Sequence, residues 1–320
     1  MLQSIFLTGA TGFVGGAILN RLHNENKHPV VAVVRSESRL QVQSVPSICI
    51  DTFDGDTRWE DKFANSNVII HSAARVHVMN DAEADPLAAF RKVNVEGTLN
   101  LARQAAASGV RRFIFISSIK VNGEGTAPGA PYTADDAPAP ADPYGISKME
   151  AEQGLRKLAA ETAMEVVIIR PVLVYGPGVK ANFLNMMRWL DKGIPLPFGA
   201  IYNSRSLVAL DNLVDLVLTC ISHPAAANQT FLVSDGDDLS TTALLKRMAK
   251  ALNKPARLIP VPSWMLQGGA EILGKKGLSQ RLCGSLQVDI TKTRSLLGWI
   301  PPVSVDEALA TTALYFREHR

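Results

Sequence analysis

A glycine-rich segment near the start of the chain limits its possible folds more than any other feature. Residues 8–15 read Thr-Gly-Ala-Thr-Gly-Phe-Val-Gly, between the apolar run of residues 4–7 and the helical apolar pattern of residues 14–22. Glycines between a strand and a helix let the backbone turn tightly and approach a pyrophosphate at the helix N-terminus. The segment predicts a dinucleotide-binding turn, the alternative being a flexible turn without a ligand. The candidate cofactor contacts are Gly9, Thr11, Gly12, Phe13, Val14 and Gly15.

Strand-like and helix-like patterns then alternate as far as residue 170. The strand-like runs are almost entirely apolar, which is typical of a parallel sheet that helices cover on both faces. They lie at residues 30–34, 48–50, 68–70, 113–116 and 166–169, and the helical patterns between them lie at residues 86–108 and 144–162. We therefore predict an α/β fold: a Rossmann-type doubly wound parallel sheet with a smaller C-terminal α/β substrate-binding part.

The pattern changes after residue 170, where loops rich in proline and glycine separate shorter elements. We predict an NAD(P)-binding Rossmann domain over residues 1–170, with residues 205–225 returning to it. Residues 171–320 would then form the substrate-binding part, which we expect to bind a nucleotide sugar. Residues 127–142 are rich in proline, alanine and aspartate and predict a surface loop.

Composition excludes several classes of protein. The chain has 320 residues, 47% hydrophobic and 20% charged, which is enough apolar material for a large core. A net charge of +3 leaves no footprint for nucleic acid. Three widely spaced cysteines indicate neither a disulfide framework nor a metal site, so we expect a reducing cytoplasm. No apolar stretch reaches the ~20 residues that span a bilayer, and no signal peptide is expected.

Residues that follow the second strand bear on the choice of cofactor. An acidic residue there would bind the ribose of NAD, whereas an arginine can hold the 2′-phosphate of NADP. Arg35 stands there, with Arg39 close behind, although both can equally be solvated surface residues. We therefore favour NADP(H), with NAD(H) as the alternative. The further candidate contacts are Asp51 and Thr52 after the third strand and Ala73 and Ala74 after the fourth.

A tyrosine and a lysine supply candidate acid/base chemistry. Tyr144 and Lys148 are four residues apart, so they share one face of the predicted helix. A lysine cation stabilises a phenolate and is expected to lower the pKa of the tyrosine from its usual value near 10. Such a tyrosine could donate or accept a proton near neutral pH. Both residues are also candidate cofactor contacts.

Together these segments resemble the extended short-chain dehydrogenase/reductase (NAD-dependent epimerase/dehydratase) family. The matching pieces are residues 8–15, His71-Ser72-Ala73-Ala74, residues 94–98, Ser117-Ser118, Tyr144-Gly145-Ile146-Ser147-Lys148 and residues 170–177. The resemblance extends to about residue 225 and is looser beyond it. It implies a glycine turn for the pyrophosphate, with Tyr144 as the acid/base beside Lys148. Ser118, three residues before Val121, would bond the reacting sugar oxygen, and Asn94 would order the site from a helix.

The resemblance also implies substrate contacts and an assembly. Asn182 and Arg205 fall where sugar-nucleotide members contact the diphosphate, and Arg281 is a third candidate near the nucleotide. Asn182 could instead cap a helix, and the arginines could form ordinary surface pairs. Relatives commonly dimerise through the two helices predicted at residues 86–108 and 144–162, so we expect a homodimer.

Three departures from the family pattern bear on the reaction. Ile119 and Lys120 stand where 4,6-dehydratases carry an Asp-Glu pair, so a dehydratase is not expected. Asn122 replaces the tyrosine of a Val-Tyr-Gly motif, and Leu173 replaces an asparagine that bonds the sugar nucleotide in many 4-epimerases.

These departures, with Arg35, favour net reduction. The chain looks most like bacterial reductases of the 4-keto group of a UDP-4-keto-6-deoxy-N-acetylhexosamine, which supply UDP-N-acetylquinovosamine for O-antigen. The alternative is a UDP-hexose or UDP-N-acetylhexosamine 4-epimerase with tightly bound NAD. Reduction of a non-nucleotide ketone comes third. A non-catalytic dinucleotide sensor is disfavoured, because it would be expected to lose Tyr144 or Lys148.

Overall fold

One parallel sheet runs through the larger part of the molecule. The computed structural model describes residues 2–36, 40, 42, 44–59, 61–63, 65–76, 85–127, 129–272 and 276–319. In these residues the sheet has the strand order β3-β2-β1-β4-β5-β6-β9. The strands are β1 (Ile5–Thr8), β2 (Val30–Val34), β3 (Ser47–Cys49), β4 (Val68–His71), β5 (Arg112–Ile116), β6 (Glu165–Pro171) and β9 (Thr230–Val233). The reversal of strand order beside β1 confirms the predicted doubly wound Rossmann-type fold.

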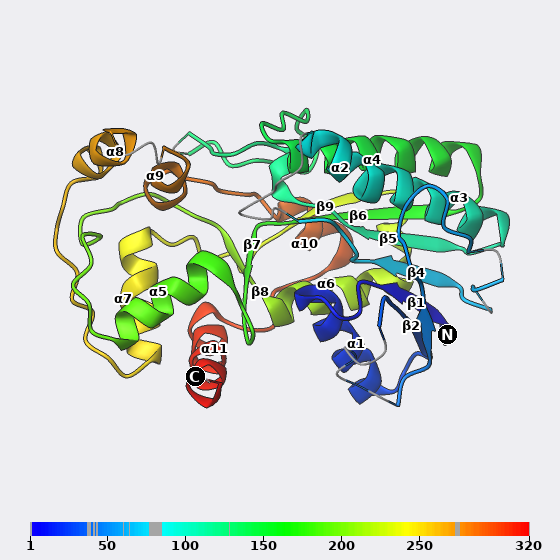
Figure 1. The fold of residues 1–320 in the computed structure, drawn as a ribbon, viewed down its shortest axis with the longest axis horizontal. Coiled ribbons are helices and arrows are strands. Elements are labelled where there is room, and N and C mark those ends of the chain that lie inside the picture. Colours follow the sequence, from blue (N-terminus) through cyan, green and yellow to red (C-terminus); the bar gives the residue numbers. More distant parts are fainter. Residues whose placement is uncertain are drawn as a thin grey trace.

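Helices cover both faces of this sheet, as the apolar strands predict (Figure 1). One face carries α1 (Phe13–Glu25) and α6 (Leu210–Ser222), and the other carries α2 (Pro86–Arg91), η2 (Lys92–Gly97), α3 (Thr98–Ala107) and α4 (Pro143–Glu161). Alternate residues of β1 point to opposite faces of the sheet and contact different helix layers. Leu7 packs in the cluster that contains Ile18 of α1, whereas Phe6 packs in the cluster that contains Leu155 of α4.

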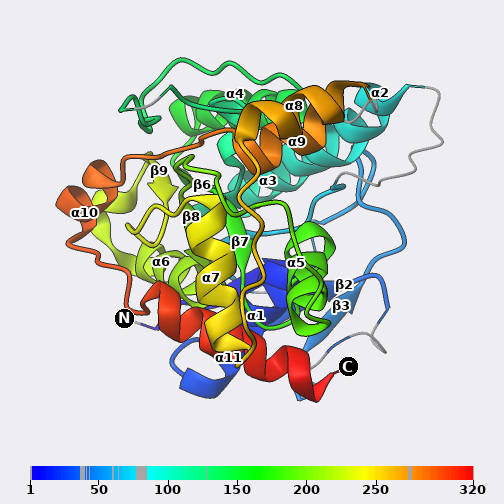
Figure 2. The ribbon, with the colours of Figure 1, turned by 90° about the vertical axis from the view of Figure 1, so that its left-hand side faces the viewer.

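A smaller part lies beyond the carboxyl ends of the strands (Figures 1 and 2). It contains a parallel pair of short strands and five helices among the described residues, and its apolar cluster includes Phe183, Leu245 and Leu309. The elements are β7 (Leu173–Tyr175), β8 (Leu207–Ala209), α5 (Ala181–Asp191), α7 (Thr241–Ala251), α8 (Ser263–Ile272), α9 (Lys276–Cys283) and α11 (Val305–Glu318). Short helical turns at η3 (Ile119–Val121) and η4 (Pro224–Ala226), together with α10 (Thr291–Leu297), complete the described elements.

The chain crosses between the two parts more than once. β9 pairs with β6 inside the main sheet. This strand follows residues 205–225, the only C-terminal segment expected to return to the larger part. Thr293 of α10 donates a hydrogen bond to the Leu232 carbonyl oxygen of β9 (2.7 Å). The division at residue 170, with the return of residues 205–225, stays a prediction.

Two predicted segments differ in detail from the structure. The helix expected over residues 86–108 contains the π-helical stretch η2, and π-helical turns are frequent at functional sites. The predicted loop over residues 127–142 (residue 128 lies outside the described residues) adheres to a distant segment. The Tyr132 amide donates to the Gln287 carbonyl oxygen (2.9 Å), and the Asp289 amide donates to the Tyr132 carbonyl oxygen (2.8 Å).

Two features are absent from the described residues. No helix there combines the length and apolar character that crossing a membrane requires. No group of three or more histidine, cysteine, aspartate or glutamate side chains in the described part of the chain is placed to hold a metal ion.

Candidate active site

The glycine turn packs directly against the loop that follows β4. Gly9 has a φ of +74°, and its carbonyl oxygen accepts a hydrogen bond from the Gly12 amide (2.9 Å). A Cβ on Gly9 would lie 2.6 Å from the Ala73 nitrogen, and a Cβ on Gly15 would lie 2.1 Å from the Gly9 oxygen. A side chain at either position would therefore force the turn open.

This turn has the features of a pyrophosphate site. Gly12 is the N-cap of α1, and among the described residues no side-chain hydrogen bond caps the N–H groups of the first turn. Thr11 and Gly12 are exposed, and Ala73 and Ala74 are small and half-buried. An uncapped helix start attracts an anion through its free N–H groups and its positive end. The residues present fit a dinucleotide.

The other candidate cofactor contacts lie at the same edge of the sheet. Arg35 directly follows β2 and is exposed, and Asp51 and Thr52 are exposed just after β3. Because β1, β2 and β3 are parallel and adjacent, their carboxyl ends point to one edge, beside Gly9. Arg39 lies outside the described residues. This placement agrees with contacts to the adenosine half, which stay a prediction.

His71 acts as a buried link. Its two ring nitrogens lie 2.6 Å from the Thr8 hydroxyl and 2.9 Å from the Thr98 hydroxyl, and the ring stacks between Phe53 and Phe115. Burial, and secondarily the Lys148 cation, holds the pKa of His71 well below its usual value. The residue is therefore neutral at physiological pH and joins β4 to β1 and α3.

Asn94 ties three elements together behind the catalytic residues. Its side-chain oxygen accepts from the Arg75 amide (2.8 Å), and its side-chain nitrogen donates to the Arg75 carbonyl oxygen (3.0 Å) and to the Ser147 hydroxyl (3.0 Å). The Ser147 hydroxyl donates in turn to the Tyr144 carbonyl oxygen (2.8 Å). The buried Asn94 thus holds the loop after β4 against the first turn of α4. Its role in ordering the catalytic residues stays a prediction.

The helix α4 positions Tyr144 and Lys148. Asp142 is its N-cap, accepting a hydrogen bond from the Gly145 amide (2.7 Å), and Pro143 takes the first helical position. The ring of Tyr144 packs edge-on against Phe90, with the ring centres 5.9 Å apart. Lys148 is buried, donates to the Ile116 carbonyl oxygen (2.9 Å) and lies 4.4 Å from the centre of the Phe115 ring.

The pKa values of this pair depart from the expectation. Burial raises the pKa of the Tyr144 phenol above its usual value, and the Asp142 charge raises it further. Burial also lowers the pKa of Lys148 to about 7, against the opposing effect of Glu152. The expected lowering of the Tyr144 pKa by Lys148 is therefore wrong for this structure. Burial is the main cause, and the Lys148 ammonium group is directed to Ile116 and Phe115.

The two neighbouring serines have different environments. Ser117 is buried and donates to Oε1 of Glu152 (2.5 Å). Ser118 is half-buried and caps η3, where its hydroxyl accepts from the Lys120 amide (3.2 Å). Ser117 is thus committed to a buried carboxylate, and the choice of Ser118 as the catalytic serine stays a prediction.

A buried ion pair beneath the site is a feature that the sequence reasoning missed. Arg170 donates to both oxygens of Glu152, at 2.9 and 2.6 Å, and to Oδ1 of Asn122 at 2.9 Å. Asn122, a departure from the family motif, is thus a structural partner of Arg170. The sequence contained one sign of this ion pair. Glu152 is a carboxylate one helical turn after Lys148, in a helix that packs on the sheet, so a buried cationic partner for it could have been predicted.

The candidate substrate residues are only partly brought together. Arg205 donates to the Gly284 carbonyl oxygen (3.0 Å), and its pKa is lowered by burial and by the nearby charge of Arg281. Two neighbouring guanidinium groups favour an anionic ligand. Asn182 is exposed at the second position of α5, whose N-cap is Lys180, so the capping alternative is wrong. Leu173 is 48% exposed at the start of β7.

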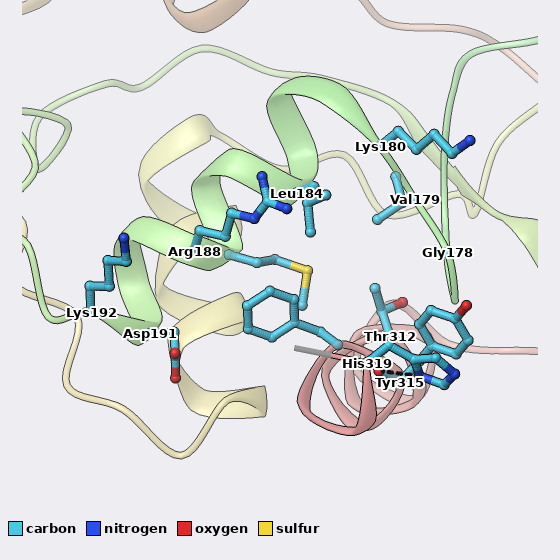
Figure 3. A pocket seen from close by; sticks show the side chains of 12 residues that line it. Gly178, Val179, Lys180, Leu184, Arg188, Asp191, Lys192, Thr312, Tyr315 and His319 are labelled. Atoms are coloured by element: carbon cyan, nitrogen blue, oxygen red, sulfur yellow. Dashed lines mark hydrogen bonds between the residues drawn. The ribbon is translucent and has the colours of Figure 1, made fainter.

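A groove of about 490 Å³ lies elsewhere, between α5 and α11 (Figure 3). Apolar side chains such as Leu184 line it, together with the cationic residues Lys180, Arg188 and Lys192. The charged ends of these three residues are spread apart and do not converge on one point (Figure 3). The groove contains none of the candidate catalytic residues, so it is not part of the candidate active site.

Comparison with known proteins gives a consistent picture. The model of the NAD dependent epimerase/dehydratase family matches residues 5–234. A UDP-glucose 4-epimerase of Vibrio cholerae is 51% identical over 319 residues, which cover 99% of this chain and 96% of that protein. A GDP-6-deoxy-D-mannose reductase of Pseudomonas aeruginosa is 24% identical, over 97% of this chain and 95% of that protein. The crystal structure of a Thermotoga maritima UDP-glucose 4-epimerase with UDP-glucose has a TM-score of 0.78 and 25% identity, covering 99% of each chain.

Proposed function

We propose, because the chain belongs to the NAD dependent epimerase/dehydratase family, that it is a 4-epimerase of a UDP-hexose or a UDP-N-acetylhexosamine. The chain is an enzyme of this family, and the observation that carries the finer proposal is its 51% identity with the Vibrio cholerae UDP-glucose 4-epimerase over nearly the whole length. The presence of Ser118, Tyr144 and Lys148 on the folded site supports the same chemistry.

The reductase expected from the sequence is less well supported than this alternative. Asn122, counted as a departure in the site, bonds the buried Arg170 and therefore reports on packing beneath the site. The exposed Leu173 and Arg35 still favour a 4-keto-sugar reductase that uses NADPH, which stays the second candidate. We propose NAD as the cofactor of the epimerase.

In this proposal the residues of the chain move one proton and hold one oxygen. Ser118 holds the 4-oxygen of the sugar, and Tyr144 takes its proton in one direction and returns it in the other. We assign Lys148, one helical turn after Tyr144, as the cationic partner of the phenolate during turnover, although in this structure its ammonium group contacts Ile116 and Phe115. When bound, the nicotinamide supplies the acceptor and donor of hydride. Because oxidation and reduction use the same groups, no net redox change is expected.

The remaining contacts in the proposal belong to the nucleotide. We assign Arg205, Arg281 and Asn182 to the diphosphate, supported by the mutual closeness of the two guanidinium groups. We assign Gly9, Gly12 and Gly15 to the cofactor pyrophosphate. A homodimer through α2, α3 and α4, and a cytoplasmic location, remain predictions.

The test is incubation of the purified protein with UDP-glucose and with UDP-N-acetylglucosamine, followed by NMR identification of the sugars. Interconversion with the 4-epimer without consumption of added cofactor is the expected result. Stoichiometric oxidation of NADPH with UDP-4-keto-6-deoxy-N-acetylglucosamine, without epimerisation, would move the assignment to the reductase. Tyr144→Phe should lower turnover by about 10²–10⁴-fold. The exposed Tyr202→Phe is the matched control and should leave turnover unchanged.

A further inference from the structure

We propose that Lys120 is a positioning residue for Tyr144: its ammonium group holds and neutralises the Asp142 carboxylate, which begins the helix that carries Tyr144. The inference rests on the proposed function only in treating Tyr144 as the acid/base. The Lys120–Asp142 ion pair lies next to Ser118, Tyr144 and Lys148. We expect its charges to act on the ionisation of Tyr144.

Lys120 connects η3, on which it lies, with Glu124 and with Asp142 at the start of α4. Its ammonium group forms one ion pair with Glu124, at 3.0 Å, and a closer one with Asp142. All three side chains are partly buried. Asp142 uses its other oxygen to accept the Gly145 amide as the N-cap of α4. One carboxylate therefore receives both a lysine cation and the start of the catalytic helix.

The backbone around this pair is closely packed as well. A Cβ on Gly145 would lie 2.9 Å from the Lys120 carbonyl oxygen and 3.2 Å from Oδ1 of Asp142. The first turn of α4 therefore rests directly on η3, where Ser118 caps and Lys120 lies. A change in the Lys120–Asp142 pair would act on Ser118 and Tyr144 through this contact.

Asp142 lies two residues before Tyr144 on the chain. Its negative charge disfavours the phenolate and so raises the pKa of Tyr144. The other charged groups near this end of α4 are Lys148 on the helix itself, Glu124 beyond η3, Arg75 over the Phe90 ring, and Arg91 paired with Glu150. Among these, Lys120 is the cation that contacts Asp142 directly.

Two substitutions make the inference testable because they should act in opposite directions. Lys120→Met leaves the Asp142 charge uncompensated, which should shift the Tyr144 pKa upward by roughly half to one unit. Asp142→Asn removes the charge and keeps a residue that caps helices well, so it should shift the pKa downward. Lys120→Arg keeps the cation and should leave the pKa unchanged. The matched control Lys157→Met breaks an exposed ion pair with Glu161 on the same helix and should also have no effect.

The shift of the acid limb of the kcat/KM pH profile between variants reports the change in the Tyr144 pKa of the working, NAD-loaded enzyme, since the phenolate is the base. The second measurement does not need turnover: the protein is labelled with fluorotyrosine, loaded with NAD, and titrated by fluorine NMR. The chain has five tyrosines, and the resonance lost in Tyr144→Phe identifies Tyr144. If no UDP-hexose is epimerised, the proposed function fails while this titration still decides the inference.

We expect the acid limb of kcat/KM and the midpoint of the Tyr144 NMR titration to move to higher pH in Lys120→Met. Both should move to lower pH in Asp142→Asn. Shifts of both variants in the same direction, or a shift as large in Lys157→Met, would overturn the inference. Unmoved pKa values with a simple loss of kcat would also overturn it, since they would show a purely structural ion pair. Should Lys120→Met not fold, Asp142→Asn and Lys120→Arg supply the same decision.

Discussion

Lys148 is the residue whose catalytic use conflicts most clearly with stability. It is buried, and burial lowers its pKa to about 7, whereas in the unfolded chain it titrates near 10.5. Below about pH 7 the folded protein must carry a buried cation, and this destabilisation is fully present. As the pH rises toward 10.5 the unfolded state binds the extra proton, so the stability of the native protein increases with pH.

Lys148→Met should therefore abolish turnover and yet raise the free energy of unfolding by about 1–3 kcal/mol at about pH 6. The gain should shrink at about pH 9, because the wild-type residue is then neutral in the native state. Denaturant unfolding at the two pH values measures the difference. Lys157→Met, which changes an exposed lysine on the same helix, should show no such pH dependence. A gain that grows with pH would contradict the assignment.

At the scale of elements, two glycines of the turn between β1 and α1 are expected to serve different purposes, one in packing and one in cofactor binding. Gly15 is needed for packing, because its Cβ would lie 2.1 Å from the Gly9 oxygen and 2.5 Å from Oγ of Ser72. Gly15→Ala should lower the free energy of unfolding by about 1–3 kcal/mol even though alanine favours helices. Gly12 has extended backbone angles and a nearest contact of 3.2 Å, so Gly12→Ala should fold and lose mainly NAD affinity.

Thermal unfolding with and without NAD distinguishes these outcomes. Gly15→Ala should lower the Tm of the free protein, whereas Gly12→Ala should lower only the increase in Tm that NAD produces. Gly268→Ala is the control: outside its own helix backbone, no atom of another described residue lies within 4 Å of a Cβ placed there, so the change should stabilise slightly. Equal effects of the first two changes on the free protein would show that both glycines serve packing alone.

Elements with strong patterns were predictable, and the misses have physical causes. The apolar strands and the Gly-rich turn revealed the Rossmann sheet because both carry local signals. β9 was missed, since its four residues give no period and its place in the sheet depends on pairing with β6, far away in sequence. The Tyr144 pKa was predicted in the wrong direction for a similar reason: the helical spacing gives the Lys148 neighbour but not the burial or the Asp142 charge.

At the scale of the whole molecule, three distant segments build the boundary between the two parts. The Thr126 amide donates to the Ser285 carbonyl oxygen (2.9 Å), and the Ser206 amide donates to the Leu286 carbonyl oxygen (2.8 Å). Arg205 lies in the middle segment and Arg281 just before the last one. A diphosphate held by both arginines would therefore stabilise the larger part, the smaller part and the boundary together.

UDP should thus raise the Tm of the whole protein in a single transition, since a ligand at about 100 times its Kd adds about 2.7 kcal/mol. UMP, with one phosphate fewer, should raise it less. Arg281→Met should raise the Kd for UDP about tenfold, because a charge-assisted contact contributes roughly 1.5–3 kcal/mol. Arg281 is exposed, so the Tm of the free protein should hardly change. The exposed Arg317→Met on α11 is the matched control. If Arg281→Met and Arg317→Met bind UDP equally well, the diphosphate lies elsewhere and the closeness of Arg205 and Arg281 serves only the fold.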